Sequence, residues 1–405
     1  MTMKPFKELM PREEAIKIIL EKVKPVTNTE KIQIQDSVGR VLAMDIVAGF
    51  DVPPFDRASM DGYAVQAKST KGASEASPIK LKLIGAQHTG GIYEGTIDSG
   101  ECLEIATGSS MPDGADAVVM VEYTELDGDM VLIKRDVEPS DNMAPAGEDM
   151  VKGTKVVKTG STVTPGVLGA LAALGYIDVE VYVKPRIAIY SSGPEISPQG
   201  TPLKAGQIYD INSFTLASVI EINGGVPYKC GIMEDTIESI RGSLKDVSEY
   251  DLGVFSGGSS VGVKDLFGEA IKEIGEIYFH GVKTKPGKPT LFGKVKDTLV
   301  FGMPGYPTSC LNNSYVYLLP ALRKMARLEP KHWIILDVPM GESFESKGDR
   351  EQFVTVEINE GKAYRVFKQS GDITSMTHAD GFIILPIGYS RISEGDIVQV
   401  TLLNV

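Results

Sequence analysis

Hydrophobic residues recur at two different periods along this chain of 405 residues, and the period changes at only a few places. The first periodic stretch, residues 11–23, places Ala15, Ile16, Ile19 and Leu20 at helical spacing. It opens on a proline, which suits the first position of a helix because that position needs no N–H donor. The stretch is therefore predicted to form a helix with one buried face.

From residue 62 to about residue 143 the period shortens to two. Runs such as "IKLKLIGA" and "AVVMVEYTELDGDMVLIKR" alternate apolar and polar positions and are broken by Gly and Asp turns. This is typical of strands and indicates a β-rich module. The stretch 164–184 then reads as a helix that ends at Gly175, followed by a strand. Pro185 interrupts the chain and indicates that a new domain starts after it.

Residues 186–326 alternate regularly between the two periods. Strands such as "RIAIYSS", "YKCGI", "LGVFSGG" and "LVFGMPG" are separated by helical stretches such as "NSFTLASVIEI" and "TIESIRGSLKDV". This rhythm predicts a parallel sheet with helices on both faces. From about Lys331 the chain returns to strand-like alternation, for example "EQFVTVEI" and "GDIVQVTLL", which suits a small barrel.

The expected fold is a multidomain α/β plus β protein, since the chain is longer than one ordinary domain. Its predicted parts are a small N-terminal α+β linker domain (1–48 plus 145–185), a β-rich arm (49–144), a central doubly wound parallel α/β domain (186–326) and a C-terminal β-barrel (327–405).

Composition narrows the classes of partner. The formal net charge is −13, from 41 basic and 54 acidic residues spread along the chain, which argues against a nucleic-acid partner held through its phosphates. Three widely spaced cysteines form no CxxC pair, so neither a disulfide framework nor a structural zinc site is indicated. No stretch suits a signal peptide or a membrane helix, so we expect a cytoplasmic protein that does not contact membranes.

The predicted sheet would gather three small-residue loops at one edge. Its first, third and last strands run into "SSGPE", "SGGSSVGVKD" and "MPGYPTS", and ligands of such sheets bind outside the carboxyl ends of the strands. Any tight strand-to-helix turn needs glycine, so one such loop alone would not indicate a ligand. Three together let backbone N–H groups approach an anion, and a phosphate-bearing ligand is expected. The residues expected to contact it are Ser256, Gly257, Gly258, Pro304, Gly305 and Pro307.

Cations for this anion come from a separate loop. The segment from Gly257 to Gly262 has the glycine spacing of a nucleotide P-loop, but Val263 stands where that motif requires lysine, so an ATPase of that type is rejected. In "KTKPGKP", Lys285 and Lys288 flank a Pro-Gly turn that limits their movement. Two lysines three residues apart usually form a solvated face. Between prolines and beside an anion site, we interpret them as oxyanion ligands.

Acidic residues accompany the same loops. Glu195, Asp235 and Asp265 stand at loop starts, where each alone could cap a helix or lie in its first turn. Two or three carboxylates near a phosphate suit Mg²⁺, which prefers oxygen ligands. The combination predicts metal-assisted chemistry at a phosphate bond.

A second candidate region is the stretch 53–65, "PPFDRASMDGYAV". Two prolines fix the backbone and remove donors, so we expect an ordered, non-helical loop that holds its side chains in place. Asp56 and Asp61 could be turn formers that bond their own backbone. The alternative is that they face a functional site.

Several motifs together resemble the molybdopterin molybdenumtransferase family. They are, in order, "FDRASMDGYAV", "ATGSSMPDGADAVVMVE", "AGEDMVKG", "SGGSSVGVKD", "KPGKP" and "PGYPTS", and they span nearly the whole chain. The chain looks like an archaeal-type member. Its central domain alone also resembles the molybdopterin adenylyltransferase fold and a domain of competence-damage-type proteins.

The resemblance implies an activity, partners and site residues. The family inserts molybdate into adenylylated molybdopterin and releases AMP, here with Mg²⁺ and with molybdate or tungstate as substrate. It also implies a homodimer whose active site lies between the central domain of one subunit and the arm of the other, and a molybdopterin adenylyltransferase as a candidate partner. The implied functional carboxylates are Asp61, Asp149, Glu195, Asp235 and Asp265, of which Asp61, Asp235 and Asp265 would hold the metal ion. Thr107 matches a pterin-site hydroxyl, and the positions matching oxometalate ligands are Lys285, Lys288, Ser309 and Ser370.

The chain departs from the family pattern at several of these places. An acidic pair appears as Pro194 and Glu195, and the asparagine of "PGNP" is Tyr306. An arginine-rich stretch reads "MAPA", and a barrel arginine is Thr355. We therefore expect weaker positive charge around the oxometalate, which Arg350 could restore from nearby, and the choice between molybdate and tungstate stays open.

Two other functions compete with a transferase. One is a non-catalytic molybdopterin-binding scaffold or carrier, which the missing basic residues favour. The retained carboxylates oppose it, since a binder of an anion gains nothing from burying five negative charges. The other is a nucleotide-processing hydrolase, which explains only residues 186–326.

Overall fold

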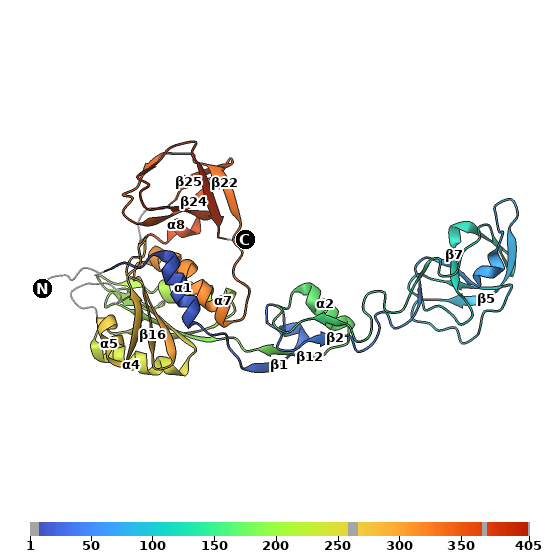
Figure 1. The fold of residues 1–405 in the computed structure, drawn as a ribbon, viewed down its shortest axis with the longest axis horizontal. Helices are drawn as coiled ribbons and strands as arrows, with labels where there is room; N and C mark the ends of the chain where they lie inside the picture. The colour runs from blue at the N-terminus through green and yellow to red at the C-terminus, as the bar shows by residue number, and fades with distance from the viewer. Residues whose placement is uncertain (1–7, 258–265, 367–370, 404–405) are drawn as a thin grey trace. The chain divides into compact units, whose positions relative to one another are not determined.

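The computed structural model describes residues 8–257, 266–366 and 371–403 (Figure 1). These residues form two compact units. The first comprises the chain up to Glu30, residues 39–41 and the chain from Val181 onward, and the second comprises residues 31–38 and 42–180. The four-domain boundaries expected from the sequence are finer than this division and stay a prediction.

The first unit is built on a six-stranded sheet with the order β16-β13-β17-β21-β20-β18. In that order the strands are Val226–Met233, Arg186–Ser192, Leu252–Ser256, Thr298–Met303, Leu291–Val295 and Gly275–His280. The first four run parallel, whereas β20 is antiparallel to both β21 and β18. The sheet is therefore mixed, and the all-parallel prediction was wrong for β20, whereas β18 again runs in the direction of the first four strands. The reason is a hairpin whose turn includes Lys296 with φ +52°, where no crossover helix intervenes.

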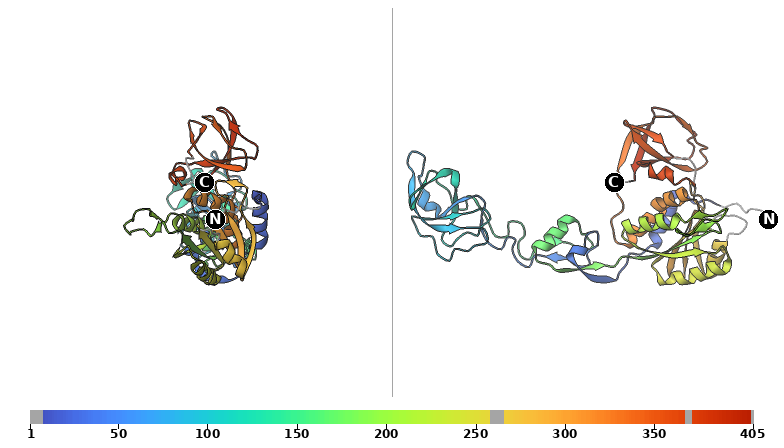
Figure 2. Two further views of the ribbon diagram at one scale, coloured as in Figure 1. Left: turned by 90° about the vertical axis from the view of Figure 1, so that its left-hand side faces the viewer. Right: turned by 180° about the vertical axis from the view of Figure 1, so that it is seen from behind.

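Helices cover both faces of this sheet (Figures 1 and 2). On β13, Ile187 and Ile189 face a core that includes α3 (Asn212–Ile222) and α1 (Arg12–Lys22). Ala188 and Tyr190 alternate to the opposite face, against α4 (Ile237–Asp246) and α5 (Leu266–Ile274). Alternate residues of one strand thus serve two cores, which confirms the doubly wound arrangement.

The helix predicted over residues 11–23 is α1, and its apolar face is buried as expected. Ala15 and Ile19 are completely buried. They pack in the same core as α7 (Leu319–Met325), which lies beside α1 in Figure 1. The hydrophobic spacing read from the sequence therefore identified the helix and its buried side.

The stretch predicted as the last helix of the central domain is divided into three. It forms α6 (Pro307–Asn313), a π-helical turn (Ser314–Leu318) and α7. Pro320 lies in the first turn of α7 and lacks the N–H that a continuous α-helix would need there. Widening of the preceding turn avoids the clash between a proline ring and the carbonyl of the previous turn.

The C-terminal strands form a second sheet in the first unit. Its order is β19-β24-β26-β28-β22, with β25 paired to β24. The strands, in chain order, are Thr284–Lys285, Ile335–Pro339, Glu351–Asn359, Lys362–Arg365, Gly381–Leu385 and Ile397–Leu402. Among the described residues these pairings trace an open path, so closure into a barrel stays a prediction. The short strand β19 joins the lysine-bearing segment of the central domain to this sheet.

The second unit contains a six-stranded sheet with the order β7-β4-β6-β5-β9-β8. In that order the strands are Ala117–Met120, Gly62–Val65, Glu101–Ile105, Ile79–Gln87, Met130–Ile133 and Thr124–Asp127. This confirms a β-rich module where the sequence alternates. The unit also contains α2 (Pro165–Ala173), which Thr164 caps by accepting the N–H of Val167 at 3.3 Å. None of the helices in the described ranges is both long and apolar enough to cross a bilayer.

Candidate active site

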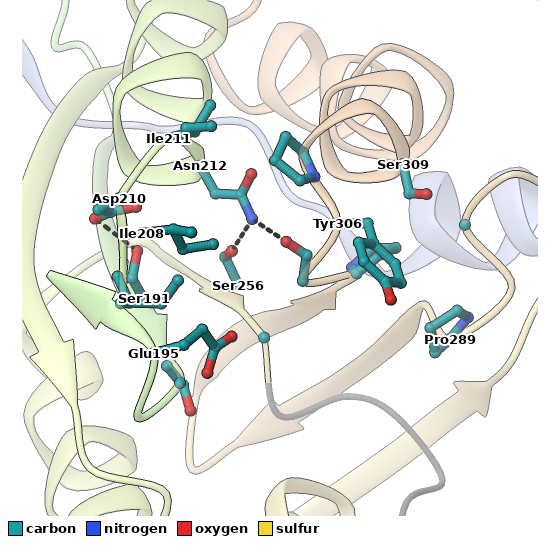
Figure 3. Close-up of a pocket in the computed structure, with 18 of the residues that line it drawn as sticks. Ser191, Glu195, Ile208, Asp210, Ile211, Asn212, Ser256, Pro289, Tyr306 and Ser309 are labelled. Atoms are coloured by element: carbon teal, nitrogen blue, oxygen red, sulfur yellow. Dashed lines mark hydrogen bonds between the residues drawn. The ribbon is translucent and has the colours of Figure 1, made fainter. Parts of the chain in front are cut away.

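A cavity of about 860 Å³ opens at the carboxyl ends of β13, β17 and β21. This is the edge at which ligands of such sheets bind. Its walls come from the three loops singled out in the sequence and from the loop that carries the two lysines (Figure 3). A cavity of this volume is large enough for a nucleotide-sized ligand.

A buried aspartate supports the first wall. Asp210 accepts a hydrogen bond from the Ser191 hydroxyl at 2.9 Å and another from the backbone N–H of Ser213 at 3.1 Å, in the first turn of α3. Asn212 donates to Ser256 Oγ at 2.7 Å and to the Gly305 carbonyl at 2.8 Å, as Figure 3 shows. These bonds connect the ends of three neighbouring strands and fix the floor of the cavity.

A close backbone approach requires glycine at position 257. Gly257 has φ +88°, and a Cβ there would lie 2.2 Å from the Ser192 carbonyl oxygen. Gly193 has φ +150°, which other residues rarely adopt, and a Cβ there would lie 2.8 Å from both carboxylate oxygens of Glu195, so that side chain folds back over the first loop.

Among the residues that the structure describes, three cations line the cavity: Lys285, Lys288 and Arg350. Arg350 precedes β24, which pairs in parallel with β19 and so lies beside Lys285. Burial alone would raise the pKa of the neighbouring Asp349, but Arg350 and Lys285 hold its pKa below the ordinary value. The Arg350 guanidinium lies 3.2 Å from that carboxylate. The second sheet therefore contributes a third cation beside the two lysines.

Two of the predicted carboxylates, Glu195 and Asp235, line the same cavity and are exposed to it. Asp235 is not a helix cap: Thr236 has that role for α4 and accepts the N–H of Ser239 at 3.2 Å. In the described part of the chain no three His, Cys, Asp or Glu side chains are close enough together to hold a metal ion. A protein nevertheless usually supplies only one or two carboxylate ligands to Mg²⁺, and phosphate oxygens and water provide the remaining ligands. Glu195 and Asp235 match that number.

Asp61 lies in the second unit and is held by one neighbour. Its Oδ1 accepts the backbone N–H of Thr107 at 2.7 Å and the Thr107 hydroxyl at 2.8 Å. These two hydrogen bonds lower the pKa of Asp61, because they stabilise the ionised carboxylate. Asp61 lines a hollow of about 130 Å³, together with His88 and Glu104 among others.

The two motifs that carry Asp61 and Thr107 are packed against each other by their backbones. Ala58 donates to the Ser109 carbonyl at 2.9 Å, and Gly108 donates to the Ala58 carbonyl at 2.8 Å. Asp56 instead holds the loop that precedes "GED", accepting the N–H of Ala146 at 2.8 Å. Neither aspartate of the loop 53–65 bonds its own turn: Asp56 anchors a distant loop, and Asp61 lines a hollow.

The structure places most of the predicted site residues. Ten of them line the large cavity: Glu195, Asp235, Ser256, Gly257, Lys285, Lys288, Pro304, Gly305, Pro307 and Ser309. Three belong to the second unit: Asp61, Thr107 and Asp149. Asp149 is exposed, and its backbone N–H donates to the Val52 carbonyl at 3.0 Å. Three lie outside the described residues: Gly258, Asp265 and Ser370.

Sequence reasoning missed several residues of the cavity wall, among them Ser191, Asp210 and Asn212. The available signal was "YDINS", residues 209–213, where Asp210 and Asn212 stand just before the predicted helix. Such side chains are seldom buried unless they have hydrogen-bond partners. Thr355, where the family resemblance led us to expect an arginine, is buried in β24 and does not line the cavity. Arg350, which lies five residues before Thr355 in the sequence, does line the cavity.

Comparison with known proteins agrees with this architecture. Three family models match in succession: the MoeA N-terminal region (domains I and II) over residues 10–175, a probable molybdopterin-binding domain over 188–324, and the MoeA C-terminal region (domain IV) over 337–403. A molybdopterin molybdenumtransferase of Bacillus subtilis is 32% identical over 407 residues, covering 98% of this chain and 94% of the relative. The chain belongs to the MoeA family.

Other MoeA-family members match over the whole length. A putative molybdopterin biosynthesis protein of Methanocaldococcus jannaschii is 32% identical, covering 99% of this chain and all of the relative. The crystal structure of a MoeA protein from Pyrococcus horikoshii has 38% identity and a TM-score of 0.85, covering 98% of this chain and 99% of that one. The resemblance seen in the sequence motifs is thereby confirmed, and the MoeA family places the chain in molybdenum cofactor biosynthesis.

Proposed function

We propose that this MoeA-family protein is a molybdopterin molybdenumtransferase that inserts molybdate or tungstate into adenylylated molybdopterin and releases AMP. The observation that carries the proposal is the large cavity, in which glycine-rich strand ends meet Lys285, Lys288 and Arg350. Backbone N–H groups and cations are what a phosphate and an oxometalate both need. Membership of a family whose curated relatives carry this name supports the reaction class.

In this proposal the lysines and Arg350 bind the oxometalate. A dianion is desolvated when it enters a cavity, so it needs several charge-assisted hydrogen bonds to remain bound. Lysine offers a compact charge, and arginine offers a planar fork of donors that matches two oxygens at once. The lysines and Arg350 would bring the oxometalate next to the dithiolene sulfurs of molybdopterin. Metal insertion and cleavage of the phosphoanhydride that joins molybdopterin to AMP could then proceed as one coupled event.

Glu195 and Asp235 would hold Mg²⁺ against the phosphates of the substrate, with Asp61 and Asp265 as the further ligands expected from the family. The fit rests on two exposed carboxylates in one cavity and on the preference of Mg²⁺ for oxygen ligands. When bound, the ion would neutralise charge that develops on the leaving phosphate. Asp61 suits this role because its lowered pKa keeps it ionised.

We further propose that the protein acts in the cytoplasm as a homodimer. The arm carrying Asp61 would then complete the cavity of the other subunit, as the family resemblance implies. Asp149 would act from the same arm, and a molybdopterin adenylyltransferase would be the supplier of the adenylylated substrate. We expect neither nucleic acid nor membrane as a partner.

The test is AMP release from adenylylated molybdopterin by the purified protein with Mg²⁺, comparing molybdate, tungstate and no oxometalate. We expect release that depends on one or both oxometalates. Tight binding of the substrate without release would contradict a transferase and would favour the scaffold. Release that ignores the oxometalate would favour a hydrolase instead.

A further inference from the structure

The two lysines of the cavity are separated by a two-residue turn, Pro286 and Gly287, and we call residues 285–288 the lysine loop. Its backbone is anchored on one side, where Val282 and Thr290 each donate an N–H to the Lys288 carbonyl at 2.9 Å. Gly287 has φ +97°, which is accessible to glycine and costly for other residues. The position of both ammonium groups therefore depends on how this turn is held.

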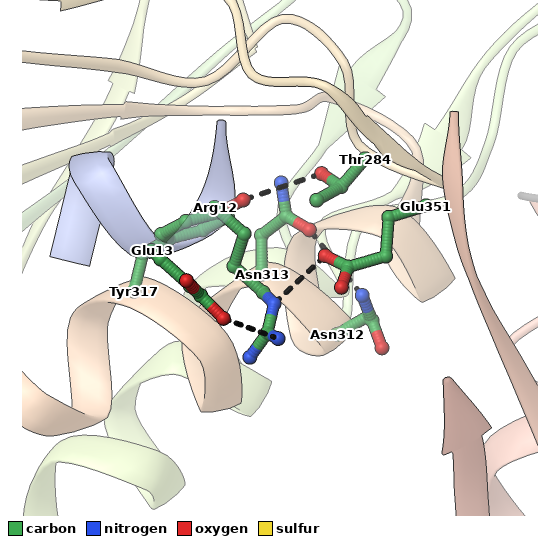
Figure 4. A network of polar contacts seen from close by, with 7 residues as sticks. All are labelled: Arg12, Glu13, Thr284, Asn312, Asn313, Tyr317 and Glu351. Carbon is green, nitrogen blue, oxygen red and sulfur yellow. Dashed lines mark hydrogen bonds and ion pairs between the residues drawn. The ribbon is translucent and has the colours of Figure 1, made fainter. Parts of the chain in front are cut away.

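Two buried side chains, Asn313 and Thr290, hold the turn from behind. Asn313 is completely buried, and its Nδ2 donates to the Gly287 carbonyl at 2.8 Å and to Thr290 Oγ1 at 2.6 Å. Its Oδ1 accepts the amide of Asn312 at 3.3 Å, an interaction drawn in Figure 4. The Thr290 hydroxyl in turn donates to the Gly287 carbonyl at 2.9 Å. Every polar atom of the Asn313 side chain is thus used.

The orientation of this amide is fixed by chemistry. The Gly287 carbonyl can only accept, so the nitrogen of Asn313 must face it. The contact is also close, since a Cβ on Gly287 would lie 2.2 Å from that nitrogen. Asn313 therefore packs directly against Gly287 and also donates a hydrogen bond to its carbonyl.

Asn313 occupies a position that connects the lysine loop to another wall of the cavity. It is the last residue of α6, and the same helix begins with Pro307 and carries Ser309, both of which line the cavity. The segment that precedes the lysine loop is held separately. Its strand β19 pairs with β24, and the Arg12 guanidinium binds the carboxylate of Glu351, the first residue of β24, at 2.7 Å (Figure 4). Only the turn itself depends on Asn313.

We propose that Asn313 is a positioning residue for the anion site: it holds the turn between Lys285 and Lys288 so that both ammonium groups converge on one bound oxometalate. The inference rests on the proposed function for the identity of the anion. Asn313 itself does not line the cavity. It acts through the geometry of the two lysines, and its loss should weaken oxometalate binding without removing any charge.

The test compares two buried asparagines in the full-length protein. In Asn313→Leu the hydrogen bond to the Gly287 carbonyl of the lysine loop and the one to the Thr290 hydroxyl are both lost. Asn223→Leu is the matched control: Asn223 is also buried, donates to the Val219 carbonyl at 2.8 Å and accepts from Arg323 at 3.3 Å, but does not line the cavity. Molybdate and tungstate are titrated calorimetrically, and hydrogen exchange is followed in peptides covering residues 282–290.

We expect Asn313→Leu to weaken oxometalate binding about tenfold and to accelerate exchange in residues 282–290, while Asn223→Leu changes neither. Thr290→Val, which removes one hydroxyl from the same cluster, should reproduce a smaller loss if the leucine variant does not fold. Unchanged affinity in both Asn313→Leu and Thr290→Val would overturn the proposal, as would an equal loss in the control.

Failure of this inference is separable from failure of the proposed function. If the unmodified protein shows oxometalate-dependent AMP release but the Asn313 and Thr290 variants keep full affinity, only the positioning role is wrong. If exchange in residues 282–290 responds as expected but no oxometalate binds, the turn is held as described and the anion assignment is wrong.

Discussion

The two candidate regions of this protein differ in kind. The cavity of the first unit has a volume of about 860 Å³, mixes carboxylates with three cations and is assembled from several loops. The hollow around Asp61 in the second unit measures about 130 Å³, and of its two carboxylates, Asp61 and Glu104, that of Asp61 is oriented by Thr107. The first has the volume and the cations that suit a large anionic ligand, whereas the second presents one oriented carboxylate.

This difference indicates a division of labour. A cavity with many weakly directional contacts supplies affinity, and a carboxylate with a lowered pKa supplies a defined charge at a defined point. Substitutions in the cavity should therefore affect binding first, and substitutions around Asp61 should affect turnover first. Each prediction below tests one side of that distinction.

The largest effect is expected from removing both lysines. Lys285→Met combined with Lys288→Met should weaken molybdate binding by about a hundredfold or more, because each charge-assisted hydrogen bond contributes about 1.5–3 kcal/mol. Calorimetric titration measures the loss. Lys294→Met, on the surface beside Asp297, is the control and should keep full affinity. Equal affinity in the double variant would remove the basis for an anion site here.

Asp61→Asn should stop AMP release almost completely while leaving molybdate affinity unchanged. The amide keeps the shape of the carboxylate but cannot carry its charge. Turnover is followed by chromatography of AMP, and Asp127→Asn, an exposed aspartate of the same unit, should retain activity. Loss of oxometalate affinity in Asp61→Asn would contradict the division of labour.

Arg350→Ala should weaken oxometalate binding by about tenfold, less than loss of the two lysines, since one cation of three is removed. Arg350→Lys should recover part of the loss, because it restores the charge but not the planar fork. The same titration decides the outcome. If Arg350→Ala binds as tightly as the unmodified protein, the second sheet contributes no ligand to the anion.

Thr107→Ala should shift the acid limb of the pH profile of AMP release to higher pH. The backbone N–H of Thr107 lowers the pKa of Asp61 most, and its hydroxyl lowers it further, so losing the hydroxyl lets that pKa rise part of the way toward the ordinary value. Protonation, and loss of activity, then begin at a higher pH. Thr107→Ser keeps a hydroxyl and should keep the original profile. If the unmodified protein, Thr107→Ala and Thr107→Ser all have the same acid limb, the group that titrates in the pH profile is not Asp61.

Tyr306→Asn should have the smallest effect. Tyr306 replaces the family asparagine at the start of α6, and 68% of it is exposed at the cavity. Restoring asparagine should change substrate affinity by only a few-fold, since an exposed ring has little packing to lose. A much larger change would identify Tyr306 as a main contact of the substrate.

How far the sequence predicts this molecule depends on the range of the interactions involved. Helix α3 appears at the residues the pattern predicts, because its period and neighbouring turns are local features. Strands β18 and β20 were missed because the strand–helix rhythm places a helix between strands, whereas these two are joined to their neighbours directly, by a loop and by a hairpin turn. Which strands pair, and in which direction, is decided by the partner strand and leaves little trace in local propensity.

The same distinction applies to the candidate site. The glycine loops were predicted because they follow strands whose carboxyl ends meet at one edge of the sheet, and the lysines because they flank a Pro-Gly turn near that edge. Asp210 and Asn212 were missed because their role appears only when three strand ends meet. Thr107 was assigned to the substrate by resemblance, whereas in the structure its hydroxyl is bonded to Asp61. Hydrogen-bond partners far apart in the chain cannot be read from residue type.

The most direct test of the central claim, that the cavity and the Asp61 hollow serve one reaction, is a mixed dimer. The Asp61→Asn chain and the Lys285→Met, Lys288→Met chain are co-expressed with different affinity tags, and the mixed species is purified and assayed for oxometalate-dependent AMP release. If each site combines the arm of one subunit with the cavity of the other, one of two sites is intact, and about half of the unmodified activity should return. A mixed dimer as inactive as its two parents would contradict the account.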